Sequence, residues 1–351
     1  MVKNRFRVLS LALLICLCTG CSTIGYYHQS VSGHLSLISK RKPIADIVND
    51  SSRDKKLIEQ LVLAQELRTF ASTHLKLPEN DSYRSYVQLD RPYVVWSVFA
   101  APEFSVGLKN WCFPVVGCLK YRGYFDRNEA HAYAAKLADL GLDVYVSGVP
   151  AYSTLGWFDD PLLSTMLNRG ELVTATYIFH ELAHQQFYLK GDTGFNEAFA
   201  TAVEELGVNL WLQHRGQTDA RLRYENWLTQ KKVFSDLVRQ TRQEFRKLYA
   251  RDLPAEAMRS EKRKMIADLR KRFEDLARHN DQLLRYRKWM SGPLNNAQLG
   301  ARALYRDLTP VFKRLFHACG RDFTGFYQRV EEISELSKEK RKQVLTSHPK
   351  C

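Results

Sequence analysis

Residues 179–184 read Phe-His-Glu-Leu-Ala-His and place two histidines four positions apart, with a glutamate directly after the first. On an α-helix, positions i and i+4 lie on one face, so the imidazoles of His180 and His184 can reach one ion. The surrounding segment 172–187 is largely apolar, and ionisable side chains on a buried helix need a partner or a metal. The spacing therefore predicts a metal centre. The alternative is a pair of hydrogen-bonded core histidines beside a capping glutamate.

Zinc is the ion that this ligand set favours. Zinc binds imidazole nitrogen and carboxylate oxygen, and a catalytic zinc keeps one position open for water. Glu181 follows His180 directly, so its carboxylate is placed to take a proton from that water as it attacks a carbonyl. We therefore expect one zinc ion, with His180 and His184 as ligands and Glu181 as the general base of a hydrolase.

A third ligand is expected from the helix that follows. Residues 190–194 read Lys-Gly-Asp-Thr-Gly, a turn that lets the next helix return beside the first. The first turn of that helix presents Glu197 to the two histidines. Glu204 comes seven residues later, about 10 Å along the helix axis, so both glutamates cannot bind one ion. We expect Glu197 to be the ligand, and Glu204 to orient a ligand or to bind the amine of a substrate.

Outward from these helices, the apolar pattern predicts an α+β fold with a mostly helical C-terminal half. We expect one unit over 43–345, which is α+β up to about residue 165 and helical after it. Strands are expected at 93–100, 118–125 and 142–149. Two helices are expected within 43–77. Single helices are expected at 127–140, 172–190, 195–212, 217–250, 256–290, 295–318 and 322–338, and Pro254 and Gly292-Pro293 are expected to interrupt the helical half.

The N-terminus has the pattern of a secretory signal over residues 1–20. Three basic residues precede an apolar run over 8–18, which is too short to span a bilayer comfortably. Thr19 and Gly20 then precede Cys21, an arrangement that looks like the lipobox of bacterial lipoproteins, in which the cysteine receives a lipid. Cys18 stands where leucine is usual in that motif. The alternative is an ordinary secretion signal that is cut elsewhere.

The lipobox resemblance implies a location and an anchor. Ser22 follows the cysteine, and lipoproteins without an aspartate there usually reach the outer membrane. We therefore expect a chain in the bacterial envelope, anchored by lipid on Cys21 and facing the periplasm. Residues 21–42 are expected to form a lipidated tether, with 26–36 leading away from the membrane.

Four further cysteines remain in the exported chain, where disulfides are permitted. Cys112 and Cys118 flank a turn-prone segment and are expected to pair, although a metal-binding pair is the alternative. Cys319 and Cys351 form a second candidate pair.

The formal net charge is +14, and much of it lies in one segment. Residues 213–290 carry 21 lysines and arginines against 11 acidic residues. The signs alternate at helical spacing, which favours a solvated helical face; attraction to anionic lipid or cell-wall polymer is the alternative. Nucleic acid is not expected as a partner, because the chain has an export signal and carries no nucleic-acid recognition motif.

The motif as a whole resembles the gluzincin peptidases. In that family an HExxH helix is followed by an Asn-Glu-x-x-Ala helix, here beginning at Asn196, and the aminopeptidase branch has another glutamate one heptad later. Twelve residues separate His184 from Glu197, fewer than in the well-known gluzincins.

Longer stretches extend the resemblance to most of residues 22–340. They resemble a family of bacterial lipoproteins described as predicted aminopeptidases. This resemblance implies a zincin-like fold and removal of N-terminal residues from peptides. The stretches are 92–104, 111–118, 121–125 and 151–158, together with the two helices of the predicted metal centre.

An aminopeptidase also needs a group that stabilises the oxyanion and a carboxylate that binds the substrate ammonium. Tyr152, Tyr305 and Tyr177 are candidates for the first role. For the second role the candidates are Glu204, Glu103, Asp159 and Asp160.

Two other functions remain open from the sequence. One is an envelope binding or assembly lipoprotein with a structural zinc, which an intact Glu181 disfavours because a structural site needs no base. The other is an endopeptidase that acts on envelope proteins or cell-wall peptides.

Overall fold

The computed structural model describes residues 24–114, 116–304, 308–347 and 350–351. Two of the predicted functional residues, Cys21 and Tyr305, lie outside these ranges. None of the described helices combines the length and the apolar character needed to cross a membrane.

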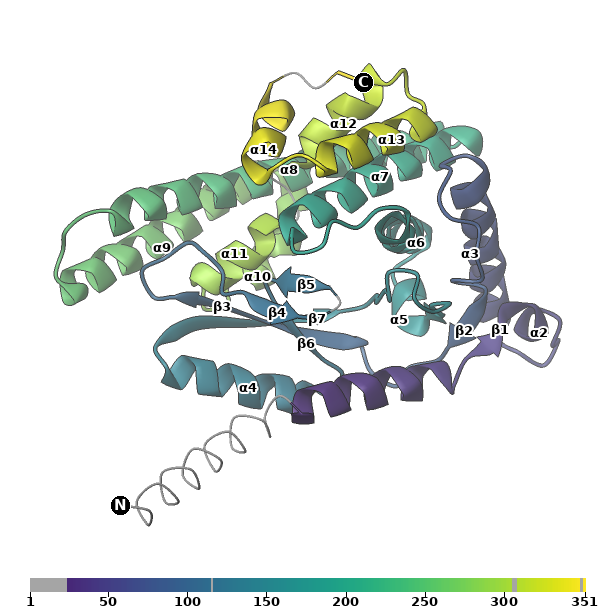
Figure 1. The fold of residues 1–351 in the computed structure, drawn as a ribbon, viewed down its shortest axis with the longest axis horizontal. Helices are drawn as coiled ribbons and strands as arrows, with labels where there is room; N and C mark the ends of the chain where they lie inside the picture. Colours follow the sequence, from purple (N-terminus) through teal and green to yellow (C-terminus); the bar gives the residue numbers. More distant parts are fainter. Residues whose placement is uncertain (1–23, 115, 305–307, 348–349) are drawn as a thin grey trace, which may run out of the picture.

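A three-stranded antiparallel sheet forms the centre of the N-terminal half (Figure 1). Strand β3 (Val95–Pro102) lies between β6 (Arg122–Tyr124) and β7 (Leu142–Val149). Helix α4 (Arg127–Asp139) covers one face of this sheet, and α11 (Asn296–Leu304) packs against the other. The sheet is therefore enclosed on both faces, one of them by a helix from the distant C-terminal half.

Strand β3 is buried on both sides, because a helix packs against each of its two faces. Trp96, Val98 and Ala100 pack with the side chains of α4, whereas Phe99 and Ala101 pack with those of α11. A continuous run of β-branched and aromatic residues is typical of a strand that is buried on both faces, as the sequence predicted for 93–100.

Two smaller sheets complete the β structure. Strands β4 (Trp111–Phe113) and β5 (Gly117–Leu119) form a hairpin, in which Cys112 and Cys118 are paired in register and joined by a disulfide. A second disulfide joins Cys319 to Cys351. The other sheet has the order β1-β2-β8 and consists of β1 (Lys42–Pro43), β2 (Ser85–Val87) and β8 (Leu162–Leu163).

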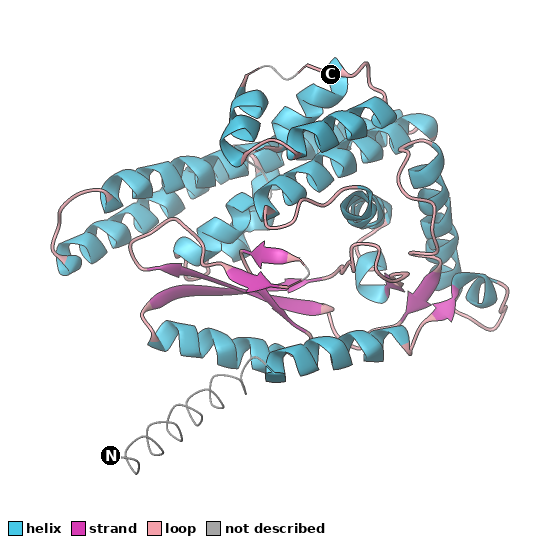
Figure 2. Cartoon of the chain, in the orientation of Figure 1, coloured by secondary structure: helices cyan, strands magenta, loops and turns pink. Residues whose placement is uncertain are grey.

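The C-terminal half is helical, and the strands are confined to the first half of the chain (Figure 2). Its central element is α7 (Thr193–His214), most of whose side chains are buried against α6 (Glu171–Gln186), α8 (Thr218–Tyr249) and α12 (Thr309–Ala318). The predicted α+β class, with helices predominating after about residue 165, is confirmed. The remaining helices are α2 (Ile44–Val48), α3 (Lys55–Thr73), α5 (Ser164–Leu167), α9 (Ala255–Arg278), the 3₁₀ helix η1 (Asp281–Tyr286), α10 (Arg287–Met290), α13 (Phe323–Ser334) and α14 (Lys338–Thr346).

Several predicted elements are divided in the structure. The helix expected over 256–290 ends at Arg278, because Asn280 adopts an extended backbone and its side chain accepts the amide N–H of Gln282. The helix expected over 295–318 is replaced by α11 and α12. Pro310 lies in the first turn of α12, where its missing N–H is tolerated. The strand expected over 118–125 is divided between β5 and β6.

Residues 24–38 form a helix that packs against the segment around β6. This part of the predicted tether is therefore a folded element. The Gln29 side chain donates to the Gly123 carbonyl and accepts the amide N–H of Phe125. The Arg122 guanidinium lies 3.9 Å from the ring centre of Tyr26. The sequence pattern did not predict this helix, because many of its apolar residues face solvent.

Candidate metal centre

Helix α6 presents the HExxH residues at its C-terminal end, and α7 returns beside it. Asn196 fixes the connection between them, because its side chain accepts the amide N–H of Leu189 and donates to the carbonyl of the same residue, both at 2.8 Å. Asp192 caps α7 by accepting the amide N–H of Phe195, and Gly191 takes the positive φ of 81° that the turn requires. The turn predicted over 190–194 therefore sets where α7 begins.

Close packing of the two helices depends on Gly207. A Cβ at this position would lie 2.9 Å from Phe179 and 2.6 Å from Leu75, so only glycine fits without a shift of its neighbours. Phe179 precedes His180, and its side chain is fully buried. The contact at Gly207 therefore helps to hold the histidine helix at its distance from α7.

Three side chains converge between α6 and α7. The ligand atoms of His180, His184 and Glu197 all lie within 4.8 Å of one another. The Glu197 Oε2 atom is 3.4 Å from Nε2 of His180 and 3.8 Å from Nε2 of His184. Among the described residues, no other three His, Cys, Asp or Glu side chains are placed to hold a metal ion in this way. Glu197 and His184 are buried, whereas His180 is slightly exposed.

The surroundings of these atoms fit a metal ion. The group offers two imidazole nitrogens and one carboxylate oxygen, which are ligands that zinc accepts. The Nδ1 atom of His180 lies 3.1 Å from Oε2 of Glu204, so Nδ1–H donating to this carboxylate leaves the Nε2 lone pair facing Glu197. Such a carboxylate behind a metal-binding histidine fixes its tautomer and orientation. Glu204 thus lies behind His180 and not beside the three converging atoms, as its distance along the helix predicted.

The charges of the group favour a cation at its centre. Burial acts to lower the pKa of His180, but hydrogen bonds to Glu197 and Glu204 outweigh it and raise this pKa to about 10. Burial acts to raise the pKa of Glu197, but hydrogen bonds from His180 and His184 lower it to about 2. The carboxylates therefore stabilise positive charge at this point, and a divalent cation would supply that charge in place of the proton.

A chain of alternating charges continues behind Glu204. The ammonium of Lys231 lies 3.8 Å from Glu204 and 3.4 Å from Glu205, and Lys313 lies 3.1 Å from the other oxygen of Glu205. Lys231 is buried, although it belongs to the basic segment that the sequence pattern assigned to a solvated face. Nothing in the spacing of α8 distinguishes this lysine from its exposed neighbours, so the sequence reasoning missed it.

Glu181 is buried beside both positive and negative side chains. Burial raises its pKa, and the nearby positive charges of His180 and His184 act in the opposite direction. The Tyr83 hydroxyl is buried, and burial together with the charges of Glu181 and Asp160 raises the pKa of Tyr83 well above its usual value. A raised pKa makes the Glu181 carboxylate a stronger base than an ordinary glutamate.

Asp160, another predicted acidic residue, lies beside Gln185 of α6. Its carboxylate accepts the amide N–H of Thr154 and lies 3.4 Å from the Gln185 amide, one turn after Glu181. Its other oxygen is buried without a partner, and burial raises its pKa to about 6. Glu103 instead forms a bidentate ion pair with Arg259, and Asp159 is exposed.

The predicted tyrosines do not gather at one point. The Tyr152 hydroxyl lies 3.3 Å from Nδ1 of His34 on the N-terminal helix. Tyr177 is half-buried on α6, one turn before Glu181, and burial raises its pKa. The sequence did not predict two further tyrosines, Tyr121 and Tyr188. Burial raises the pKa of both, and the charge of Glu197 raises it further. They come from the β5–β6 segment and the α6–α7 connection, which the sequence pattern does not place near a helix motif.

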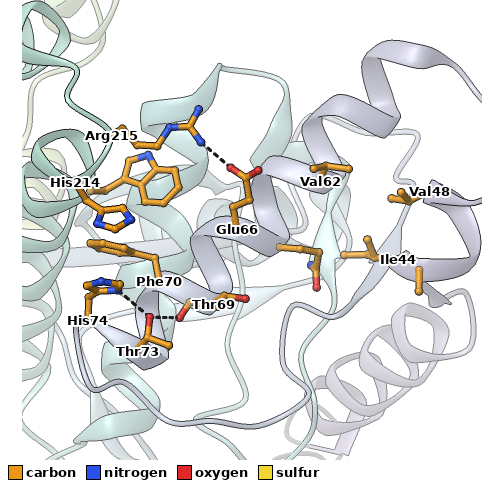
Figure 3. Close-up of a pocket in the computed structure, with 13 residues that line it drawn as sticks. Ile44, Val48, Val62, Glu66, Thr69, Phe70, Thr73, His74, His214 and Arg215 are labelled. Carbon is orange, nitrogen blue, oxygen red and sulfur yellow. Dashed lines mark hydrogen bonds and ion pairs between the residues drawn. The ribbon is translucent and has the colours of Figure 1, made fainter.

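A separate surface cavity of about 650 Å³ lies on α3 and the end of α7 (Figure 3). Phe70 stacks on His74 with ring centres 4.4 Å apart, and Arg215 forms an ion pair with Glu66 at 2.8 Å. None of the predicted site residues lines this cavity. This cavity is therefore separate from the candidate metal centre.

The chain matches a model of a known protein family. Neither the curated proteins nor the solved structures contain a match to this chain. A family model described as "Putative aminopeptidase" matches residues 25–345, which include the histidine helix, Glu197 and the whole sheet. Since this match covers most of the chain, the protein belongs to that aminopeptidase family.

Proposed function

We propose that this protein is a zinc aminopeptidase with a zincin-like, gluzincin-type site, in which His180, His184 and Glu197 hold one zinc ion and Glu181 is the general base. The observation that carries the proposal is the convergence of the three ligand atoms within 4.8 Å, with Glu181 next to His180 on the same helix. The family assignment supports a peptidase, and the two nitrogens and one oxygen support zinc.

In this mechanism a bound zinc ion supplies Lewis acidity, which polarises the scissile carbonyl and makes water more acidic. Glu181 accepts the proton of the attacking water and passes it to the leaving amine. Glu204 orients His180 by accepting its Nδ1–H, and Lys231 neutralises part of the charge of Glu204. Among the predicted candidates for stabilising the oxyanion, Tyr177 lies on the same helix as Glu181, one turn before it, and we assign this role to Tyr177.

Recognition of a free N-terminus requires an acidic group near the reacting carbonyl. Asp160 has an unpaired, buried oxygen and lies beside Gln185, on the face of α6 that carries Glu181. Glu204 is already bound to His180 and Lys231, which leaves it less suited to a substrate amine. We therefore assign the ammonium-binding role to Asp160.

A mixture of peptides tests the proposed activity, with each peptide present in a free and an N-acetylated form. The expected result is stepwise release of N-terminal residues from the free peptides, while the acetylated forms stay intact because they lack the ammonium. Internal cleavage of both forms would make the enzyme an endopeptidase. Stoichiometric zinc without cleavage of either form would favour a structural zinc.

We also propose that the protein is a lipoprotein of the bacterial envelope, with residues 1–20 removed and lipid on Cys21. Support comes from the basic, apolar and small residues that precede this cysteine. Mass spectrometry of the N-terminal peptide is expected to show a chain that begins at Cys21 with acyl groups attached. An unmodified chain that begins elsewhere would refute the lipid anchor and leave the metal centre unaffected.

A further inference from the structure

Exposed apolar side chains are concentrated on one part of the surface. Among the described residues, eleven large hydrophobic side chains are exposed, and six of these lie in helix 24–38 or in the adjoining loop 151–160. Contiguous exposed apolar surface of this kind marks an interaction site more often than scattered residues do. The six are Ile24 (70% exposed), Tyr27 (39%), Val31 (57%), Leu35 (59%), Trp157 (70%) and Phe158 (53%).

The four residues on the helix form a single stripe. Their spacings of three, four and four residues place them on one face, which points away from the domain. The opposite face is fixed to the domain through Gln29 and the fully packed Leu37, and Gly33 lies directly on the ring of Phe125. The stripe is therefore held in one orientation by contacts on the other side of the helix.

The aromatic loop continues this apolar surface toward the metal centre. The ring of Phe158 lies 4.9 Å from that of His34, at the edge of the stripe. Gly156 of the same loop lies against Gln185, one helical turn after Glu181. The loop thus contacts the edge of the stripe on one side and the helix that carries Glu181 on the other.

Charge beside the stripe points to the kind of surface that it contacts. Three basic residues lie just after the helix and are all exposed: Lys40, Arg41 and Lys42. Within the described ranges none of them has an ion-pair partner. An apolar helical stripe, interfacial aromatic residues and adjacent unpaired basic residues together are typical of elements that lie on an anionic lipid surface.

We propose that this face, made of the helix stripe with Trp157 and Phe158, rests on the surface of the lipid bilayer. The proposal rests in part on the lipid anchor proposed for Cys21, because this residue lies three positions before Ile24, the first described residue of the helix, and would bring the helix to the membrane. Helix 24–38 is then a rigid support that holds the aromatic loop and the adjoining catalytic helix at the bilayer, in place of a flexible tether.

A fluorescent label at a single introduced cysteine tests this contact in the full-length protein. Val31→Cys places the label in the stripe, and Leu222→Cys places it on an exposed leucine of α8, which lies on the other side of the sheet from the helix (Figure 1). The proteins are reconstituted in vesicles of phosphatidylethanolamine and phosphatidylglycerol that contain a nitroxide-labelled lipid. We expect the lipid to quench most of the fluorescence at residue 31 and little at residue 222.

A second substitution in the stripe checks that the face itself makes the contact. Leu35→Asp added to the residue 31 variant is expected to remove most of the quenching, with no change in metal content or in peptide hydrolysis measured in detergent. Equal quenching at residues 31 and 222, or none at residue 31 in vesicle-bound protein, would overturn the proposal.

The number of labels separates this proposal from the lipid anchor. The other described cysteines are joined in disulfides, so a lipidated chain accepts one label, whereas an unlipidated chain that keeps Cys21 also reacts there. The mass of the N-terminal peptide identifies a chain that is cut beyond Cys21. Quenching at residue 31 with a second label on Cys21 would support the membrane face and refute the anchor. A chain that does not bind the vesicles at all would overturn both.

Discussion

Glu181→Gln is expected to leave zinc binding intact and to lower peptide hydrolysis by about 10²–10⁴-fold, the usual loss when a general base is removed. Glutamine keeps the shape of the side chain but accepts no proton at neutral pH. Initial rates on a free tripeptide, together with metal content by elemental analysis, measure both parts of this expectation.

Glu171→Gln is the matched control for this variant. It makes the same change on the same helix, and its amide oxygen can still accept the Trp211 indole N–H that Glu171 accepts at 3.0 Å. Its activity is expected to stay near that of the wild type. Wild-type rates in Glu181→Gln would remove the base from the mechanism and favour a structural zinc.

Glu197→Ala is expected to lose metal affinity by orders of magnitude, because it removes one of three protein ligands. Glu204→Ala is expected to lose less, about 10–100-fold, since the loss of a group that orients a ligand typically has an effect of this size. Competition with a metal-binding dye gives both affinities on the same scale. If Glu204→Ala lost more affinity than Glu197→Ala, the ligand would lie one heptad further along α7.

The cluster of His180, His184 and Glu197 was predictable because its signals are local in the sequence. The i,i+4 spacing of the histidines places them on one helix face, and the glycine-containing turn returns Glu197 to them. The position of Glu204 away from the three converging atoms also followed from helix geometry, because seven residues separate it from Glu197. Strand β3 was predictable because its burial on both faces leaves a continuous run of β-branched and aromatic residues.

Other features were not predictable because they depend on contacts between distant segments. Lys231 is buried by Glu204 and Glu205 of another helix, while its own helix has an ordinary charge pattern. The helix over 24–38 was interpreted as a tether because its stripe faces outward, contrary to the usual pattern of a packed helix. The approach of Tyr83, Tyr121 and Tyr188 to the centre depends on loops whose path no periodicity reveals.

The central claim is that His180, His184 and Glu197 hold one zinc ion, and metal content tests it most directly. Wild-type protein purified without chelators and then dialysed is compared with His184→Ala, which removes one of the two nitrogen ligands on α6. Elemental analysis is expected to find about one zinc per wild-type chain, as expected for a single catalytic site, and most of that zinc lost in His184→Ala. Stoichiometric zinc in the folded variant would contradict the assignment.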